Sequence, residues 1–121
     1  MAVILIVEDE TILCDIAGMM VEDWGHEVLT AHSVEEALVH LRSSHGIDAL
    51  FTDIHLRSAL HGGCDLAHLA IELRPGLRVL YTTGNSSTEK LRATFVPDAQ
   101  FIGKPYSPQQ LQDSIEGLLA A

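Results

Sequence analysis

The amino-acid sequence predicts an α/β domain built on a doubly wound parallel sheet, and two patterns support that fold class. Short runs rich in Val, Ile and Leu alternate with longer segments in which apolar residues recur at helical spacing. Continuous apolar runs of this length are typical of strands buried on both faces, as in parallel sheets. The connections between segments are short, which favours consecutive strand–helix units. A chain of 121 residues has the size of one domain.

The first two strand–helix units occupy the N-terminal third. Residues 2–7 form an apolar run too short for a helix and predict the first strand, and residues 28–31 predict the second. Between them, Gly25 stands where a helix would end. Ser33 and Glu36 match a capping box that begins the second helix. The first helix is predicted from apolar residues at helical spacing, namely Ile12, Leu13, Ile16, Met19, Met20 and Trp24.

Three more units complete the alternation. Strands are predicted at residues 49–51, 79–81 and 101–102. Helices are predicted at residues 66–73, in a short segment that begins at the Ser86–Glu89 capping box and ends before Pro97, and after Ser107 and Pro108. The longest irregular stretch covers residues 54–63, and long loops of compact domains often carry function.

The charge balance excludes several classes of protein. Seven Lys and Arg against seventeen Asp and Glu give a net charge of −10, and no Lys or Arg precedes Arg42. Direct nucleic-acid binding needs clustered cations, so the chain is expected to bind none. No apolar run approaches the ~20 residues that cross a bilayer, and no secretory signal is visible. We therefore expect a cytoplasmic protein with no membrane contact, in which most of the acids form solvated helix surface.

Polar residues collect where the predicted strands end. The first strand is followed by Glu8 and Asp9, the third by Asp53, the fourth by Thr83 and the fifth by Lys104. Ligands of open α/β sheets bind beyond the carboxyl ends of the strands, so these side chains are expected on one rim. Hard carboxylate oxygens favour Mg²⁺. With that cation and Lys104 to stabilise phosphoryl oxygens, Asp53 could act as a nucleophile toward a phosphoryl donor.

At these spacings the rim resembles a known family, the CheY-like receiver domain of two-component response regulators. The resemblance is carried by Glu8-Asp9, Asp53, Thr83-Gly84, Phe101 and Lys104-Pro105. It implies one receiver domain over residues 1–121, with a (βα)5 fold and the flavodoxin-like strand order 2-1-3-4-5. It also implies a phosphoacceptor signalling domain, catalysing only its own phosphorylation and dephosphorylation, rather than an enzyme.

The resemblance assigns the acceptor and the metal ligands. Asp53 would accept a phosphoryl group from a sensor histidine kinase or a phosphotransfer protein. Glu8 and Asp9 would hold Mg²⁺ together with Asp53, and His55 would lend its backbone carbonyl. The first acid is Glu8 where the family more commonly has Asp, and its longer side chain would act through a water molecule.

The resemblance also assigns a switch. Thr83 would be the switch hydroxyl, chosen over the adjacent Thr82 because the family's hydroxyl precedes a small residue, here Gly84. Lys104 would pair with the phosphate, ahead of a cis peptide bond to Pro105. Phe101 would turn inward on activation, although a plain core residue is the alternative at that position. The surface of the fourth helix, fifth strand and fifth helix would then change its affinity for a downstream protein target, with a homodimer as a further option.

Other functions stay open at this point. The loop at residues 56–63 lacks the family's proline and is slightly longer, which leaves a phosphorylation-independent interaction module as the alternative. A small-molecule enzyme on a flavodoxin-like fold is disfavoured, because no glycine-rich phosphate loop follows the first strand. A soft-metal site can be drawn from His55, His61, Cys64 and His68, but no second cysteine completes it. Cys14 is expected to be a small buried hydrophobe without a disulfide to Cys64.

Overall fold

A computed structural model describes residues 1–56, 62–84 and 89–120, apart from the side chain of Lys90. It contains a five-stranded parallel sheet in the order β2-β1-β3-β4-β5, which confirms the predicted fold class and strand order. The strands are β1 (Val3–Val7), β2 (Glu27–Ala31), β3 (Ala49–Asp53), β4 (Arg78–Thr83) and β5 (Gln100–Gly103).

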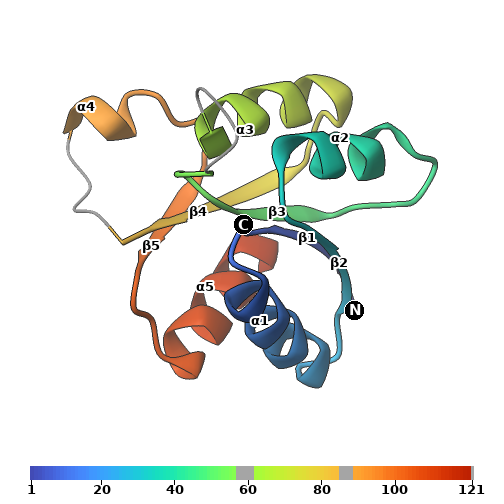
Figure 1. Cartoon of the computed structure of the whole chain (residues 1–121), viewed down its shortest axis with the longest axis vertical. Coiled ribbons are helices and arrows are strands. Elements are labelled where there is room, and N and C mark those ends of the chain that lie inside the picture. Colours follow the sequence, from blue (N-terminus) through green and yellow to red (C-terminus); the bar gives the residue numbers. More distant parts are fainter. Residues whose placement is uncertain (57–61, 85–88, 121) are drawn as a thin grey trace.

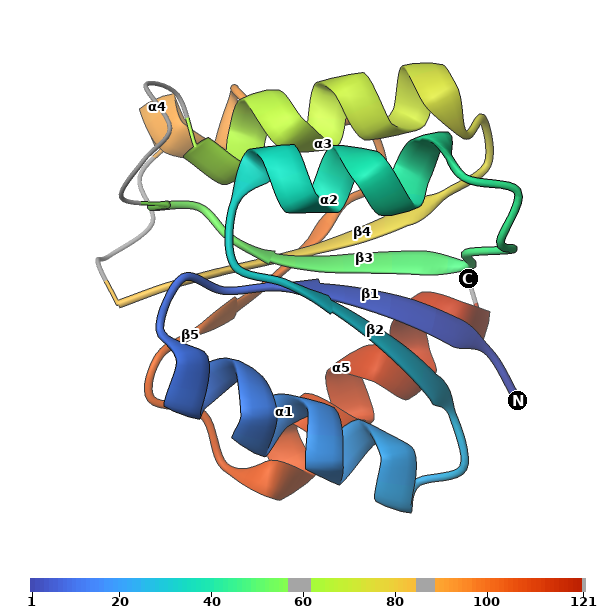
Figure 2. The ribbon, with the colours of Figure 1, turned by 45° about the vertical axis from the view of Figure 1, so that its right-hand side comes forward.

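Helices cover both faces of the sheet. On one face lie α1 (Thr11–Asp23) and α5 (Pro108–Ala120), and on the other lie α2 (Val34–Arg42), α3 (Gly62–Leu73) and α4 (Glu89–Arg92) (Figures 1 and 2). The third helix begins at Gly62, ahead of the apolar stripe that predicted it from Leu66. The irregular stretch predicted at residues 54–63 is therefore shorter than expected.

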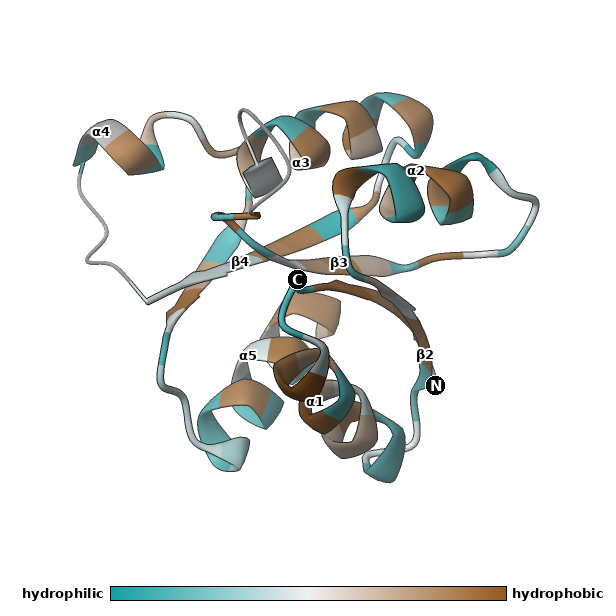
Figure 3. Ribbon diagram, viewed as in Figure 1, coloured by the Kyte–Doolittle hydropathy of each residue, from teal (hydrophilic) through white to brown (hydrophobic). Residues whose placement is uncertain are grey.

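The sheet separates two apolar cores. Strands β1 and β3, which lie at its centre, are buried along nearly their whole length, and apolar residues dominate them (Figure 3). Cys14 belongs to the core beneath α1 and α5, whereas Cys64 belongs to the core beneath α2 and α3. Both thiols are free, and the sheet stands between them.

Two of the predicted capping boxes are confirmed. The backbone N–H of Glu36 donates to Oγ of Ser33 at 3.1 Å, at the start of α2. At the start of α5, the N–H of Gln110 donates to Oγ of Ser107 at 3.1 Å, and Oε1 of Gln110 accepts from the N–H of Ser107 at 2.8 Å. Ser86, in the third predicted box, lies outside the described residues. No helix among the described residues has the length and apolar character needed to span a bilayer.

The first helix has the predicted position but buries a different face. Ile12 is 74% exposed and Met19 is 65% exposed, although both belong to the apolar stripe that predicted the helix. A Cβ on Gly18 would lie 3.5 Å from Cγ1 of Val28, so the helix approaches β2 closely there. Small side chains allow that approach, and the buried residues of α1 are Cys14, Ala17, Gly18 and Val21.

Candidate functional site

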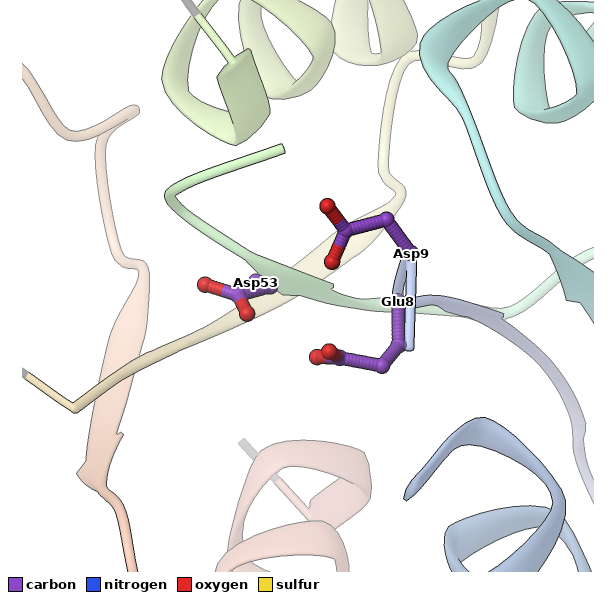
Figure 4. A group of neighbouring side chains, drawn as sticks. All are labelled: Glu8, Asp9 and Asp53. Carbon is purple, nitrogen blue, oxygen red and sulfur yellow. The ribbon is translucent and has the colours of Figure 1, made fainter. Parts of the chain in front are cut away.

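Three acidic side chains meet at the carboxyl ends of β1 and β3. Asp53 is the last residue of β3, and the N–H of Glu8 donates to the carbonyl of Ala31, extending the ladder beyond β1. One carboxylate oxygen from each of Glu8, Asp9 and Asp53 lies within 4.8 Å of the others. Figure 4 shows the three side chains around a common space. The chain leaves β1 for β2 on one side while β3 lies on the other, so this edge is the switch point where α/β sheets bind ligands.

Lys104 ties two of these acids together. Its Nζ donates to Oε2 of Glu8 at 2.9 Å and to Oδ2 of Asp53 at 2.7 Å. The residue follows β5, where its N–H donates to the carbonyl of Thr83 at 2.9 Å. Its peptide bond to Pro105 is cis. The ammonium group is thus placed against the Asp53 carboxylate by the backbone pairing of β4 and β5.

Both acids that contact Lys104 also receive a backbone hydrogen bond. The N–H of His55 donates to Oδ1 of Asp53 at 3.0 Å, so both oxygens of that carboxylate have a donor. The N–H of Glu10 donates to Oε1 of Glu8 at 3.3 Å. His55 has an exposed side chain and adjoins the site through its backbone. Its carbonyl as a metal ligand stays a prediction.

Burial makes this cluster electrostatically demanding. Glu8 is 6% exposed and Asp53 is 7% exposed. Burial, together with the neighbouring Asp53 carboxylate, raises the pKa of Glu8 to about 7 against the opposing effect of Lys104. Burial also acts against the charge on Lys104, but its hydrogen bonds to Asp53 and Glu8 prevail and raise the pKa of the ammonium to about 12. Two buried carboxylates therefore share one ammonium, an arrangement that a further cation would relieve.

The raised pKa of Glu8 means that its carboxyl stays protonated in the folded protein at mildly acidic pH. We expect the metal-free protein to become less stable as rising pH removes this proton. The folded protein holds the proton up to a pKa of about 7, whereas the ordinary pKa of this side chain, which applies in the unfolded chain, is 4.5. The folded state therefore binds more protons between these values, and the free energy of unfolding should fall across that window by up to about 3 kcal/mol. Urea unfolding in the presence of a chelator, at a series of pH values, measures this slope. Glu8→Gln should remove that part of the slope, and parallel curves for the two proteins would contradict the assignment.

The two residues predicted to form a switch, Thr83 and Phe101, lie in the neighbouring strands β4 and β5. Thr83 is buried at the end of β4. Phe101 is half-buried in β5, beside Tyr81, and stacks on Phe95 with ring centroids 6.1 Å apart. Phe95 in turn stacks on Tyr81 at 4.2 Å. Phe101 therefore stands at the end of an aromatic row, and its rotation on activation stays a prediction.

The sequence did not predict that Thr82 lies at the site. Thr82 pairs in register with Asp53, is 2% exposed and lines the same small cavity as Glu8 and Asp53. Its neighbour Thr83 was preferred on the family pattern alone. Strand alternation could have found it, because Leu80 and Thr82 lie two residues apart on one face of β4, and Leu80 packs in the core beneath α1 and α5.

The soft-metal alternative is not supported by the residues that the structure describes. Oγ1 of Thr94 donates to Sγ of Cys64 at 3.4 Å, and Nε2 of His68 lies 2.8 Å from the carbonyl oxygen of Thr94. Cys64 and His68 thus join α3 to the segment after α4. His61 lies outside the described residues. Within the described part of the chain, the acidic cluster is the one group arranged to hold a metal ion.

This fold and rim define a receiver domain. In this five-stranded parallel sheet two acids follow β1, a third is the last residue of β3, and a lysine that follows β5 contacts that third acid. The chain matches the response regulator receiver domain family over residues 4–116 and belongs to that family. Phosphorylation on an aspartate is the general function of the family, and its members generally bind Mg²⁺ and interact with histidine kinases.

Similarity to named proteins and to solved structures supports membership of this family. The chain is 28% identical to the transcriptional regulatory protein ZraR of Salmonella typhimurium over 118 residues, which are 97% of this chain and 26% of that protein. A response regulator receiver protein from Sinorhizobium medicae is 29% identical, with a TM-score of 0.90 and coverage of 99% and 95% of the two chains. NtrX from Brucella abortus is 28% identical, with a TM-score of 0.88 and coverage of 98% and 27%. The chain thus spans about a quarter of the length of its curated relatives.

Proposed function

We propose that this chain is a receiver domain over residues 1–121 that accepts a phosphoryl group on Asp53, in a reaction that depends on Mg²⁺. The observation that carries the proposal is the environment of the Asp53 carboxylate. It is buried at the end of β3, beside two further acids and in direct contact with the Lys104 ammonium. The donor would be a sensor histidine kinase or a phosphotransfer protein, in the cytoplasm.

The acidic cluster has the chemistry of a magnesium site. Glu8, Asp9 and Asp53 offer hard oxygens within 4.8 Å of one another, and Mg²⁺ is usually held by one or two carboxylates with several waters. These three residues, with the carbonyl of His55, would hold the ion. When bound, Mg²⁺ neutralises charge on the transferring phosphoryl group. Glu8 supplies one more methylene than Asp would, and its Oε2 is held by Lys104.

Phosphoryl transfer would use Asp53 as the nucleophile. A carboxylate oxygen of Asp53 forms a bond to phosphorus while the bond from phosphorus to the donor atom breaks, and the donor leaves with that electron pair. Lys104 lies 2.7 Å from Oδ2 of Asp53, close to the charge that the new phosphoryl oxygens bring. The N–H of His55 fixes Oδ1. The Lys104 ammonium and the His55 N–H are therefore in place before the phosphoryl donor binds.

The output would be a change in protein docking. We propose that the Thr83 hydroxyl moves toward the phosphoryl oxygens and that Phe101 then turns inward, altering the surface of α4, β5 and α5. The position of Thr83 between Asp53 and Phe101 in the order of the sheet supports this route. Its target would be a downstream protein or a second copy of this chain.

The proposal predicts one phosphoryl adduct that depends on Asp53. Incubation with Mg²⁺ and an acyl phosphate should add a single phosphoryl group to the intact protein, as measured by mass spectrometry. Asp53→Asn should abolish the adduct because the amide is not a nucleophile of this kind, and chelation of Mg²⁺ should do the same. Asp15→Asn, on the exposed surface of α1, is the matched control and should label normally.

A wild-type protein that gains no adduct would overturn the proposal. If partner binding were also indifferent to Mg²⁺, to the acyl phosphate and to Asp53→Asn, the chain would be a phosphorylation-independent interaction module instead.

A further inference from the structure

The hydroxyl of Thr82 is buried beside the acidic cluster and is not hydrogen-bonded. Among the buried side-chain oxygens and nitrogens of the described residues, Oγ1 of Thr82 is the one without a hydrogen-bond partner. Thr82 is 2% exposed, so its hydroxyl does not form a hydrogen bond with bulk water. An unpaired buried hydroxyl destabilises the folded protein, and native proteins rarely leave such a group unpaired.

Thr82 lines a small space beside the carboxylates of Glu8 and Asp53. The space leaves about 10 Å³ for the centre of a water-sized sphere. Its other polar walls are the side chains of Glu8 and Asp53, and Tyr106 lines it as well. The remaining walls are apolar side chains of β1, α1 and β3, namely Ile6, Val7, Leu13, Ala17 and Phe51.

We propose that this space holds one ordered water molecule that joins the Thr82 hydroxyl to the carboxylates of Glu8 and Asp53. A buried water typically has about two to four polar partners, and polar cavities of about this size accept one. The water would accept the Thr82 O–H and donate its two hydrogens to the two carboxylates. Each carboxylate oxygen with one donor at present can accept a second.

The water makes Thr82 a positioning residue for the site. Glu8 and Asp53 come from different strands, and Lys104 joins them from one direction. A bridge through Thr82 would hold the same two carboxylates from the side of the space opposite Lys104. Groups that orient metal ligands typically change metal affinity by about 10–100-fold when removed. The positioning role of Thr82 rests on the proposed function, whereas the presence of the water does not.

The test compares three proteins without and with metal. Thr82→Val has nearly the same shape and lacks the hydroxyl, while Thr82→Ser keeps the hydroxyl and loses only a methyl group. In metal-free protein, water-to-protein nuclear Overhauser effects at the Ala17 and Thr82 methyl groups report a long-lived buried water. Mg²⁺ is then titrated alone into each protein by calorimetry, and urea unfolding confirms that each variant is folded.

We expect the water signal at Ala17 in the wild-type protein and in Thr82→Ser, and its loss in Thr82→Val. Mg²⁺ should bind Thr82→Val about tenfold more weakly, and Thr82→Ser within about twofold of wild type. A wild-type protein without the water signal, or an undiminished signal in Thr82→Val, would overturn the water. Loss of the water with unchanged Mg²⁺ affinity would overturn the positioning role. Wild-type protein that binds no Mg²⁺ would count against the proposed function, and the water signal would still decide the inference.

Discussion

Replacing Gly63 by alanine should destabilise this protein by about 3 kcal/mol or more and distort the acidic cluster around Asp53. A Cβ at this position would collide with the carbonyl oxygen of Asp53 and would lie 3.0 Å from Oγ1 of Thr52. The obstacle is the backbone of β3, which cannot rotate away as a flexible side chain would. The N–H of Gly63 also donates to the carbonyl of Ile54 at 2.8 Å, so the start of α3 is fixed against the strand end.

Urea unfolding measures this loss, and Gly46→Ala is the matched control. Gly46 has open space around a Cβ and no positive φ, so alanine there should be neutral or add up to about 1 kcal/mol. The Gly63 variant should also bind Mg²⁺ more weakly, because any shift that admits the methyl group moves Asp53. Equal stability of the two variants would mean that α3 can move away from β3 at no cost.

The fold was predictable because its signals are local and periodic. Residues 2–7 and 49–51 lie at the centre of the sheet and are buried on both faces, so their sequences are continuously apolar. The orientation of α1 was not predictable in this way. Its apolar residues outnumber those that the sheet can cover, and the face that packs is chosen by the small residues Ala17 and Gly18. Which face packs depends on the shape of the partner surface, which hydrophobic periodicity does not encode.

The site was predictable for those residues whose positions are fixed by the ends of strands. The site residues lie at the carboxyl ends of three different strands, and the topology brings Glu8, Asp9, Asp53 and Lys104 together. The role of Thr82 depends on a cavity and on an unsatisfied hydroxyl, which exist only after the chain is packed. The same holds for the partners of Cys64 and His68, which look like metal ligands by spacing and instead contact Thr94.

Replacing Lys104 by methionine should separate metal binding from phosphoryl transfer. In the metal-free protein the ammonium occupies Oε2 of Glu8 and Oδ2 of Asp53, two of the oxygens that a metal would need. It also carries like charge to Mg²⁺. Its removal should therefore raise Mg²⁺ affinity, by on the order of tenfold for charges at this range in a partly solvated site. Calorimetric titration of Mg²⁺ measures the change.

The same substitution should slow labelling of Asp53 at saturating Mg²⁺ by about 10²-fold. A preorganised cation beside the acceptor stabilises charge that develops on the transferring group, and removal of one such donor typically costs about 10²–10³-fold in rate. The rate is read by intact mass against time with an acyl phosphate. Lys104→Arg keeps the charge and should leave Mg²⁺ affinity close to wild type. If Lys104→Met weakened Mg²⁺ binding as well, the ammonium would be organising the two carboxylates for the metal rather than competing with it.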